Sequence, residues 1–328
     1  MTPESVRVSI GTAAVLGLAK CRMSVPPTTA YLMTYVEGRC SANCAFCPQA
    51  RESRSDPALL SRVDWPAYPL RSVLRAFSTR RPFKRICLQA LNYPGFAEEI
   101  AQILGRMKKG TRAPRSLCAP PLPRGSLLEL LDLGVDRVCF ALDAATPKVF
   151  DEVKGVEVLG PYRWEEHWKA LRSALEVFGR GRVTTHLIVG LGETEEEVLE
   201  TVQRLWDLGV LPSLFAFTPI PGTKLAGHPR PSLPSYRRVQ VGRYLIVEGL
   251  GRFEEMTFDE RGVLRDFGVE REVLLRALEN GDPFRTSGCP GCNRPFYNET
   301  PRGPIYNYPR PLTGNEVEEA ISKLGVEL

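Results

Sequence analysis

Residues 31–51 read YLMTYVEGRCSANCAFCPQAR and combine a short apolar run with three closely spaced cysteines. The run Tyr31–Glu37 is rich in apolar and aromatic side chains and ends at Gly38, which is typical of a buried strand. Three thiols with C-x3-C-x2-C spacing, Cys40, Cys44 and Cys47, follow at once. The stretch therefore predicts a strand whose exit loop carries a metal site.

The same pattern of short strands continues outward from this stretch and alternates with helices. Five more strand-like runs follow: Arg85–Leu91, Arg115–Ala119, Arg137–Leu142, Val183–Leu191 and Leu214–Ile220. The helix-like stretches are Leu70–Thr79, Phe96–Lys109, Ser126–Leu133, Arg163–Phe178, Glu195–Leu208 and Ser235–Glu248. Strand–helix alternation predicts a parallel sheet with right-handed crossovers. We predict an α/β fold, a (β/α)6 partial TIM barrel over residues 31–250.

Two extensions flank this barrel. Residues 1–30 form an N-terminal extension, and residues 251–328 form a C-terminal one. In the latter we expect a hairpin turning at Arg261–Gly262 and a helix over Glu270–Asn280. Residues 281–312 are dense in proline and glycine, so we expect them to be irregular and ordered by something else, such as a metal.

Composition predicts a cytoplasmic protein whose cysteines are not paired. The 328 residues carry a net charge of +5, nine cysteines and three histidines. No signal peptide or membrane span is evident, so we expect no membrane association. The cytoplasm keeps thiols reduced, which favours metal binding where cysteines are close together. The mild basic excess is either a solvated surface or a docking face for an acidic protein, and we expect no nucleic-acid partner.

A 4Fe–4S cluster normally takes four thiolates, one per iron. Three cysteines leave one iron open, and the amino and carboxylate groups of S-adenosylmethionine fit that position. Loops after barrel strands lie at the face where barrel enzymes keep their active sites. The alternatives for Cys40, Cys44 and Cys47 are a zinc site or buried structural thiols.

The motif, with Phe46 before its third cysteine, resembles that of radical S-adenosylmethionine enzymes. The resemblance implies that Asn92 and Tyr93, in the segment LNYPG, contact the cofactor, although the family usually carries a GGE-like segment there. It also implies cofactor contacts from GLGET and from TPIPGTKL. The residues concerned are Gly190, Gly192, Glu193 and Pro219.

HLIVGLGET followed by PIPGTKL resembles biotin synthase and lipoyl synthase, which insert sulfur taken from a second, sacrificial 4Fe–4S cluster. Cys87 and Cys118 match biotin synthase ligand positions, but Thr184 stands where the third ligand is expected, and Cys118 alone is more typical of a small core residue. Near the C-terminus, Cys289 and Cys292 form a C-x2-C pair, which is also a common zinc half-site.

The segment Arg285-Thr286-Ser287 resembles the Arg-Ser-Ser of lipoyl synthase, in which the second serine ligates the sacrificial cluster. The resemblance implies that Ser287 is a catalytic oxygen ligand beside the cysteine pair. The fourth ligand is either Cys21 or Cys87, and the sequence does not choose between them. We expect Tyr297, Tyr306 and Tyr308 to pack this segment onto the top of the barrel.

Over nearly its full length the chain resembles the archaeal-type two-component lipoyl synthase, and most of all its second subunit. The resemblance implies three partners: a companion radical S-adenosylmethionine subunit, an octanoylated lipoyl domain or glycine-cleavage H protein, and an electron donor such as ferredoxin. Three alternatives remain open. They are biotin-synthase-like sulfur insertion into a free small substrate, radical chemistry without sulfur insertion, and a non-catalytic iron–sulfur scaffold or electron carrier.

Overall fold

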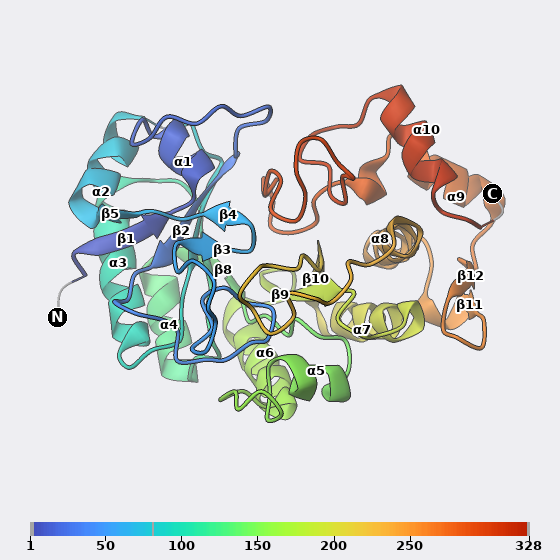
Figure 1. Ribbon diagram of the computed structural model, residues 1–328, viewed down its shortest axis with the longest axis horizontal. Helices are drawn as coiled ribbons and strands as arrows, with labels where there is room; N and C mark the ends of the chain where they lie inside the picture. The colour runs from blue at the N-terminus through green and yellow to red at the C-terminus, as the bar shows by residue number, and fades with distance from the viewer. Residues whose placement is uncertain (1–2, 81, 327–328) are drawn as a thin grey trace.

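A computed structural model describes residues 3–80 and 82–326 of the chain. One large sheet dominates it, built from β1 (Ser5–Val8), β2 (Thr29–Thr34), β5 (Ala67–Pro69), β6 (Arg85–Gln89), β7 (Arg115–Cys118), β8 (Val135–Cys139), β9 (Val183–Val189) and β10 (Val210–Ala216). The spatial order is β10-β9-β8-β7-β6-β2-β1-β5 (Figure 1). The six strands from β2 to β10 pair in parallel, whereas β1 is antiparallel to both β2 and β5.

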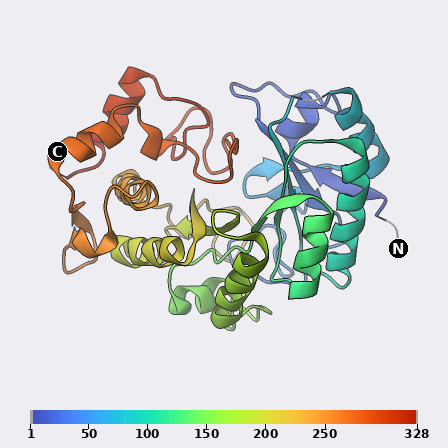
Figure 2. The same cartoon turned by 180° about the vertical axis from the view of Figure 1, so that it is seen from behind.

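Helices cover the outer side of the curved sheet (Figures 1 and 2). They are α1 (Ile10–Val15), α2 (Leu70–Thr79), α3 (Phe96–Gly110), α4 (Arg124–Asp132), α5 (Pro147–Val153), α6 (Trp164–Phe178), α7 (Glu195–Leu208) and α8 (Leu233–Val247). The C-terminal part holds η1 (Phe253–Glu255), β11 (Thr257–Phe258), β12 (Leu264–Asp266), α9 (Arg271–Leu278), η2 (Asp282–Phe284) and α10 (Gly314–Ser322). A small hairpin, β3 (Leu59–Leu60) and β4 (Val63–Asp64), follows the cysteine loop.

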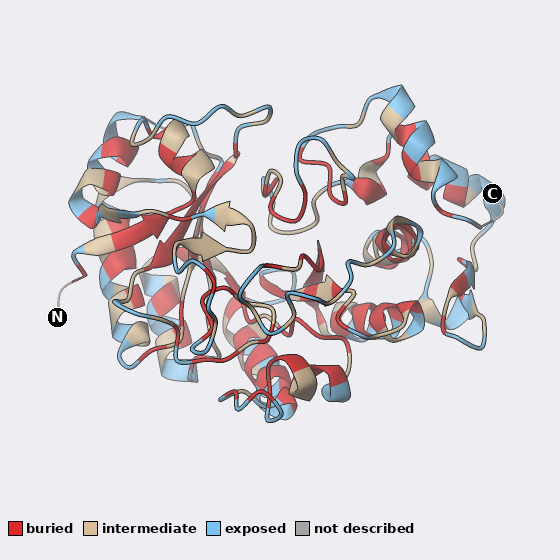
Figure 3. Ribbon diagram, viewed as in Figure 1, coloured by how far each residue is buried: buried red, intermediate tan, exposed pale blue. Residues whose placement is uncertain are grey.

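Burial explains why these segments adopt this arrangement. In Figure 3 the parallel strands of the barrel are mostly buried, and the helices that cover them turn a buried face to the sheet and an exposed face to solvent. Helix α7 also has local signals at both ends, because Thr194 and Glu197 form a capping box and Gly209 ends the helix at φ +102°. Among the described residues, no helix combines the length and the apolar character that a membrane crossing requires.

The predicted parallel (β/α)6 partial barrel is confirmed. The helices Leu70–Thr79 and Glu195–Leu208 have the bounds that periodicity predicts, and the hairpin of β11 and β12 turns around Arg261–Gly262. The last barrel strand begins earlier than predicted, at Val210 rather than Leu214. The strand includes Pro212, and β10 is an edge strand, where a proline costs no ladder hydrogen bond.

The barrel is open between β10 and β2, and a C-terminal segment, residues 287–299, covers this opening. On one side Ser287 Oγ accepts a hydrogen bond from the Leu214 N–H at 2.8 Å, and Arg294 donates to the Leu214 carbonyl at 3.4 Å. On the other side the Thr28 and Thr29 hydroxyls donate to the Gly291 carbonyl. The segment thereby satisfies part of the exposed edge of the sheet.

The direction of this segment follows from the strand ends that it contacts. Gly291 lies beside the first residues of β2, and the Pro290 carbonyl accepts from Arg85, the first residue of β6. Farther along, the Asn298 carbonyl accepts from Thr218, which follows the last residue of β10. The segment therefore runs from the N-terminal ends of the strands to their C-terminal ends. Apart from η2, residues 281–312 contain no helix or strand, as predicted.

Candidate active site

The three-cysteine loop lies at the C-terminal ends of the strands, between β2 and the small hairpin of β3 and β4. The Asn92 N–H, just after β6, donates to Cys40 Sγ at 3.2 Å. Within the loop, the Cys40 N–H donates to the Gln49 carbonyl and the Cys47 N–H to the Cys44 carbonyl, each at 3.1 Å. These bonds hold three thiols on the wall of one cavity.

This thiol set fits a 4Fe–4S cluster with one iron left without a protein ligand. Other possible donors line the same cavity but are engaged elsewhere. Asp143 forms an ion pair with Lys154 at 2.7 Å, and His167 Nδ1 lies 3.2 Å from the Arg163 carbonyl. The thiol of Cys118 lies within 4.8 Å of the ligand atoms of Cys139 and His186, a group described below. An open iron is the position that S-adenosylmethionine requires.

Burial governs the electrostatics of this cavity. It raises the pKa of the Cys47 thiol to about 12 and raises the pKa values of Cys40 and Cys44 as well. Burial alone would lower the pKa of Lys154, but the charges of Asp143 and Cys44 outweigh it and raise that pKa. Thiols that resist ionisation need a strong positive charge to become ligands, and bound iron provides one.

The predicted cofactor residues divide into two groups. Asn92 and Phe46 line the three-cysteine cavity, and Asn92 Nδ2 donates to the Tyr162 hydroxyl at 3.1 Å. Tyr93 instead packs its ring against Phe96, with centroids 6.3 Å apart.

The remaining predicted cofactor residues lie apart from the cysteines. Gly190, Gly192 and Glu193 line a separate surface hollow beside His228, whose Nε2 lies 3.0 Å from the Gly190 carbonyl. Glu193 itself accepts the Gly190 N–H at 2.7 Å. Pro219 follows β10 and lies on the wall of neither cavity. The structure thus brings only part of the predicted set to the cysteines.

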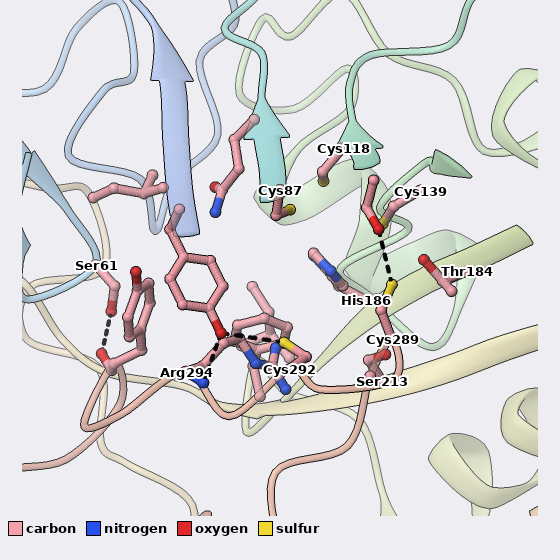
Figure 4. Close-up of a pocket in the computed structure, with 18 of the residues that line it drawn as sticks. Ser61, Cys87, Cys118, Cys139, Thr184, His186, Ser213, Cys289, Cys292 and Arg294 are labelled. Atoms are coloured by element: carbon pink, nitrogen blue, oxygen red, sulfur yellow. Dashed lines mark hydrogen bonds between the residues drawn. The ribbon is translucent and has the colours of Figure 1, made fainter. Parts of the chain in front are cut away.

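A second, central cavity fills the barrel lumen (Figure 4). Its empty volume is about 1270 Å³, part of it open to solvent. Phe46 and Cys47 of the cysteine loop line one end, and Cys289 and Cys292 line the other. Between them the wall is largely apolar, formed by Leu60, Leu117, Val138, Ile188, Phe215, Ala216 and Phe217.

The cysteine pair of the C-terminal segment lies near one barrel cysteine. Cys289 Sγ is 3.5 Å from Ser116 Oγ on β7, and Cys292 Sγ is 3.4 Å from the Tyr31 hydroxyl on β2. Cys87 lies on β6 between these strands, in register with both Tyr31 and Ser116. Burial and the charges of Cys118, Cys289 and Cys292 raise the pKa of Cys87 well above its ordinary value. Three thiols therefore face one another at one level of the lumen.

The other two predicted ligands lie elsewhere. Cys21 is exposed, and its thiol lies 3.7 Å from the Arg22 carbonyl. The Ser287 hydroxyl is bonded to β10 and lines a different surface hollow. Arg285 forms a half-exposed ion pair with Asp282 at 2.8 Å. The structure brings neither Cys21 nor the Ser287 hydroxyl to the cysteine pair.

The expectation that the C-terminal segment packs onto the top of the barrel is wrong for the cysteine pair. The pair lies near the N-terminal ends of the strands, because Gly291 and Pro290 are bonded to the starts of β2 and β6. Of the three tyrosines, Tyr297 packs against Tyr31 with ring centroids 5.3 Å apart. The ring of Tyr306 packs against Tyr236 of α8, and that of Tyr308 lies under the Arg237 guanidinium of the same helix.

Sequence reasoning missed Cys139 and interpreted His186 as a core or substrate-facing residue. The ligand atoms of Cys118, Cys139 and His186 all lie within 4.8 Å of one another. Burial lowers the pKa of His186 to about 3, and the charges of Arg294 and Lys154 act in the same direction. The ring is therefore neutral at pH 7. The signal that could have revealed the group is positional, because Cys118 and Cys139 occupy matching positions at the ends of consecutive strands.

A partial parallel barrel with three thiols in the loop after its first parallel strand defines an enzyme of the radical S-adenosylmethionine type. The chain belongs to the Radical SAM superfamily, which matches residues 35–205, more than half of its length. Members of this superfamily hold a 4Fe–4S cluster and S-adenosylmethionine, as predicted. No curated protein matches the sequence.

Solved structures of the same superfamily share the fold. Methylornithine synthase (PylB) is 14% identical with a TM-score of 0.54, over 67% of this chain and 62% of that one. The FeFe-hydrogenase maturase HydG from Carboxydothermus hydrogenoformans is 17% identical with a TM-score of 0.54, over 69% of this chain and 53% of that one. The match thus spans less than two thirds of these proteins, and at such identities it shows the fold alone.

Proposed function

We propose that this enzyme inserts sulfur into a protein-bound octanoyl chain in lipoyl cofactor biosynthesis, together with a companion radical SAM subunit. One observation carries the proposal. The central cavity has the radical-cluster loop at one end and the Cys289–Cys292 pair at the other, with apolar walls between them. An alkyl chain in that cavity would have the oxidising group on one side and a sulfur source on the other.

Each end has its own residues for this task. Cys40, Cys44 and Cys47 hold the first cluster, and Asn92 positions Cys40 through its backbone N–H. When bound, the cluster and S-adenosylmethionine supply a radical that removes hydrogen from an unactivated C–H bond. The apolar wall excludes water from that bond and orients the chain along the lumen.

The opposite end would hold a second cluster as sulfur donor. Cys87, Cys289 and Cys292 share one level of the lumen, and this geometry supports Cys87 rather than Cys21 as the additional thiolate. The net charge of +5 suits docking to an acidic carrier protein.

The test is an anaerobic assay on the full chain reconstituted with iron and sulfide. The substrates are an octanoylated lipoyl-domain peptide and, separately, free dethiobiotin, each with and without the companion subunit and reduced ferredoxin. We expect about eight irons per chain and thiolated peptide. Cys292→Ala should retain about four irons and form deoxyadenosine without thiolating the peptide, whereas the control Cys21→Ala should behave as the wild type.

Three outcomes would contradict the proposal, each in a distinct way. Thiolated dethiobiotin with unchanged peptide would indicate a biotin-synthase-like enzyme acting on a free substrate. About four irons together with zinc in the wild type would remove the sulfur donor. Reduced, reconstituted enzyme that forms no deoxyadenosine would indicate an electron carrier or scaffold.

A further inference from the structure

Three neighbouring strands of the barrel each present one potential metal ligand to the lumen. Cys118 is the last residue of β7, Cys139 is the last residue of β8, and His186 lies within β9. Cys118 and Cys139 are direct register partners, and Cys139 is paired with Thr184, two residues before His186. Side chains two residues apart on a strand share a face, so all three side chains turn to the lumen (Figure 4).

The spacing of these donors suits a single ion. Two thiolates on one tetrahedral zinc, each at about 2.3 Å, lie about 3.8 Å apart. The two Sγ atoms and the imidazole nitrogen lie within 4.8 Å of one another, which accommodates that geometry with little adjustment. A 4Fe–4S cluster binds each thiolate to a different iron and separates the sulfurs more widely. The group is therefore better suited to one cation than to a cluster.

These donors are also free for a ligand. Across residues 3–80 and 82–326, no hydrogen bond to the His186 ring occurs, and its neighbour is the Phe215 ring at a centroid distance of 4.7 Å. The ring is half-buried and lines the central cavity, so an ion in that cavity can reach it. The Cys139 thiol lies within hydrogen-bond reach of Cys118 and Thr184.

We propose that Cys118, Cys139 and His186 bind one thiophilic divalent cation, with Zn²⁺ the best chemical fit. Two thiolates and one imidazole are a donor set that zinc favours, and a site with three protein ligands leaves a fourth position open. Here that position faces the central cavity, because all three residues line it. The site uses none of the cysteines assigned to the proposed sulfur insertion, although Cys118 lies near Cys87, and it does not depend on that function.

The experiment reads zinc directly, so iron does not interfere. The full chain is reconstituted anaerobically with iron and sulfide, incubated with Zn²⁺ alone, desalted, and analysed for metals and by X-ray absorption at the zinc edge. We expect one zinc per chain with two sulfur neighbours at about 2.3 Å and one nitrogen at about 2.0–2.1 Å. Cys139→Ser and His186→Gln should each weaken zinc binding by at least about tenfold while leaving the iron content unchanged.

The matched control is Ser213→Ala, because Ser213 is the register partner of His186 on β10 and lines the same cavity. It should retain the full zinc content. A wild-type chain without tightly bound zinc, or with four sulfur neighbours around it, would overturn the proposal. So would a loss of about four irons in Cys139→Ser or His186→Gln, because these residues would then belong to a cluster. If neither variant folds, the wild-type absorption spectrum still decides.

Discussion

Replacing Glu299 by glutamine should stabilise the protein at neutral and alkaline pH. Glu299 is 1% exposed, and among the described residues its Oε2 has no hydrogen-bond partner. Burial raises the pKa of its carboxyl from 4.5 to about 7, although the Tyr306 and Asn307 N–H groups and Arg294 act in the opposite direction. A difference of about 2.5 pKa units corresponds to about 3 kcal/mol.

The sign follows from proton linkage. Below pH 4.5 the carboxyl is protonated in the folded and the unfolded chain, so it carries no penalty. As the pH rises toward 7, the carboxyl ionises first in the unfolded chain, and the free energy of unfolding falls by up to about 3 kcal/mol. Glutamine does not ionise, so Glu299→Gln should avoid this loss. His167 and His186, whose pKa values burial lowers to about 3, give the opposite slope in both proteins and cancel in the comparison.

The assay is urea unfolding of the cluster-free chain under reducing conditions, monitored by circular dichroism at several pH values between 5 and 8. The difference in unfolding free energy between Glu299→Gln and the wild type should grow with pH and level off above pH 7. The exposed Glu279→Gln is the matched control and should give no such trend. Parallel curves for Glu299→Gln and the wild type would refute the reasoning, because they would show that the buried carboxyl titrates as it does in the unfolded chain.

Three further predictions use the same unfolding assay. Lys154→Met should lower the free energy of unfolding by about 3–5 kcal/mol, because it leaves the buried Asp143 carboxylate unpaired. Adding Asp143→Asn should recover part of this loss. Gly222→Ala should lower the free energy of unfolding by about 2 kcal/mol, because Gly222 has φ +86° and an added Cβ would meet the cysteine loop. Gly227→Ala should leave the free energy of unfolding nearly unchanged. Ser287→Ala should cost about 1 kcal/mol and leave the iron content unchanged, because its hydroxyl bonds β10; a loss of about four irons would instead make Ser287 a ligand.

Local sequence patterns were sufficient to predict the barrel. Each barrel strand is a short apolar run and each covering helix has a three- and four-residue apolar period, so both signals lie within a single element. The loop with Cys40, Cys44 and Cys47 was equally local, because its thiols are close in sequence and follow a strand. Such features need no knowledge of the rest of the chain.

The lumen could not be predicted in the same way, because its chemistry depends on register between strands far apart in the sequence. Cys139 lies in an ordinary strand, and its importance appears only when β7 pairs with β8 and brings it beside Cys118. The choice between Cys21 and Cys87 was likewise open, because either is a plausible thiol by sequence. Only the packing of the C-terminal segment against β2, β6 and β7 separates the exposed Cys21 from the buried Cys87.

The path of the C-terminal segment links the fold to its chemistry. A six-stranded parallel barrel has an exposed edge at β10, and unpaired strand edges are unfavourable. Residues 287–299 cover that edge, and their bonds to Leu214, Thr29 and Thr218 fix the segment along the opening. The same bonds determine where Cys289 and Cys292 lie, at the end of the lumen opposite the radical-cluster loop. The same segment therefore both covers the opening of the barrel and positions its second group of thiols. A variant that detaches this segment should lose both features together.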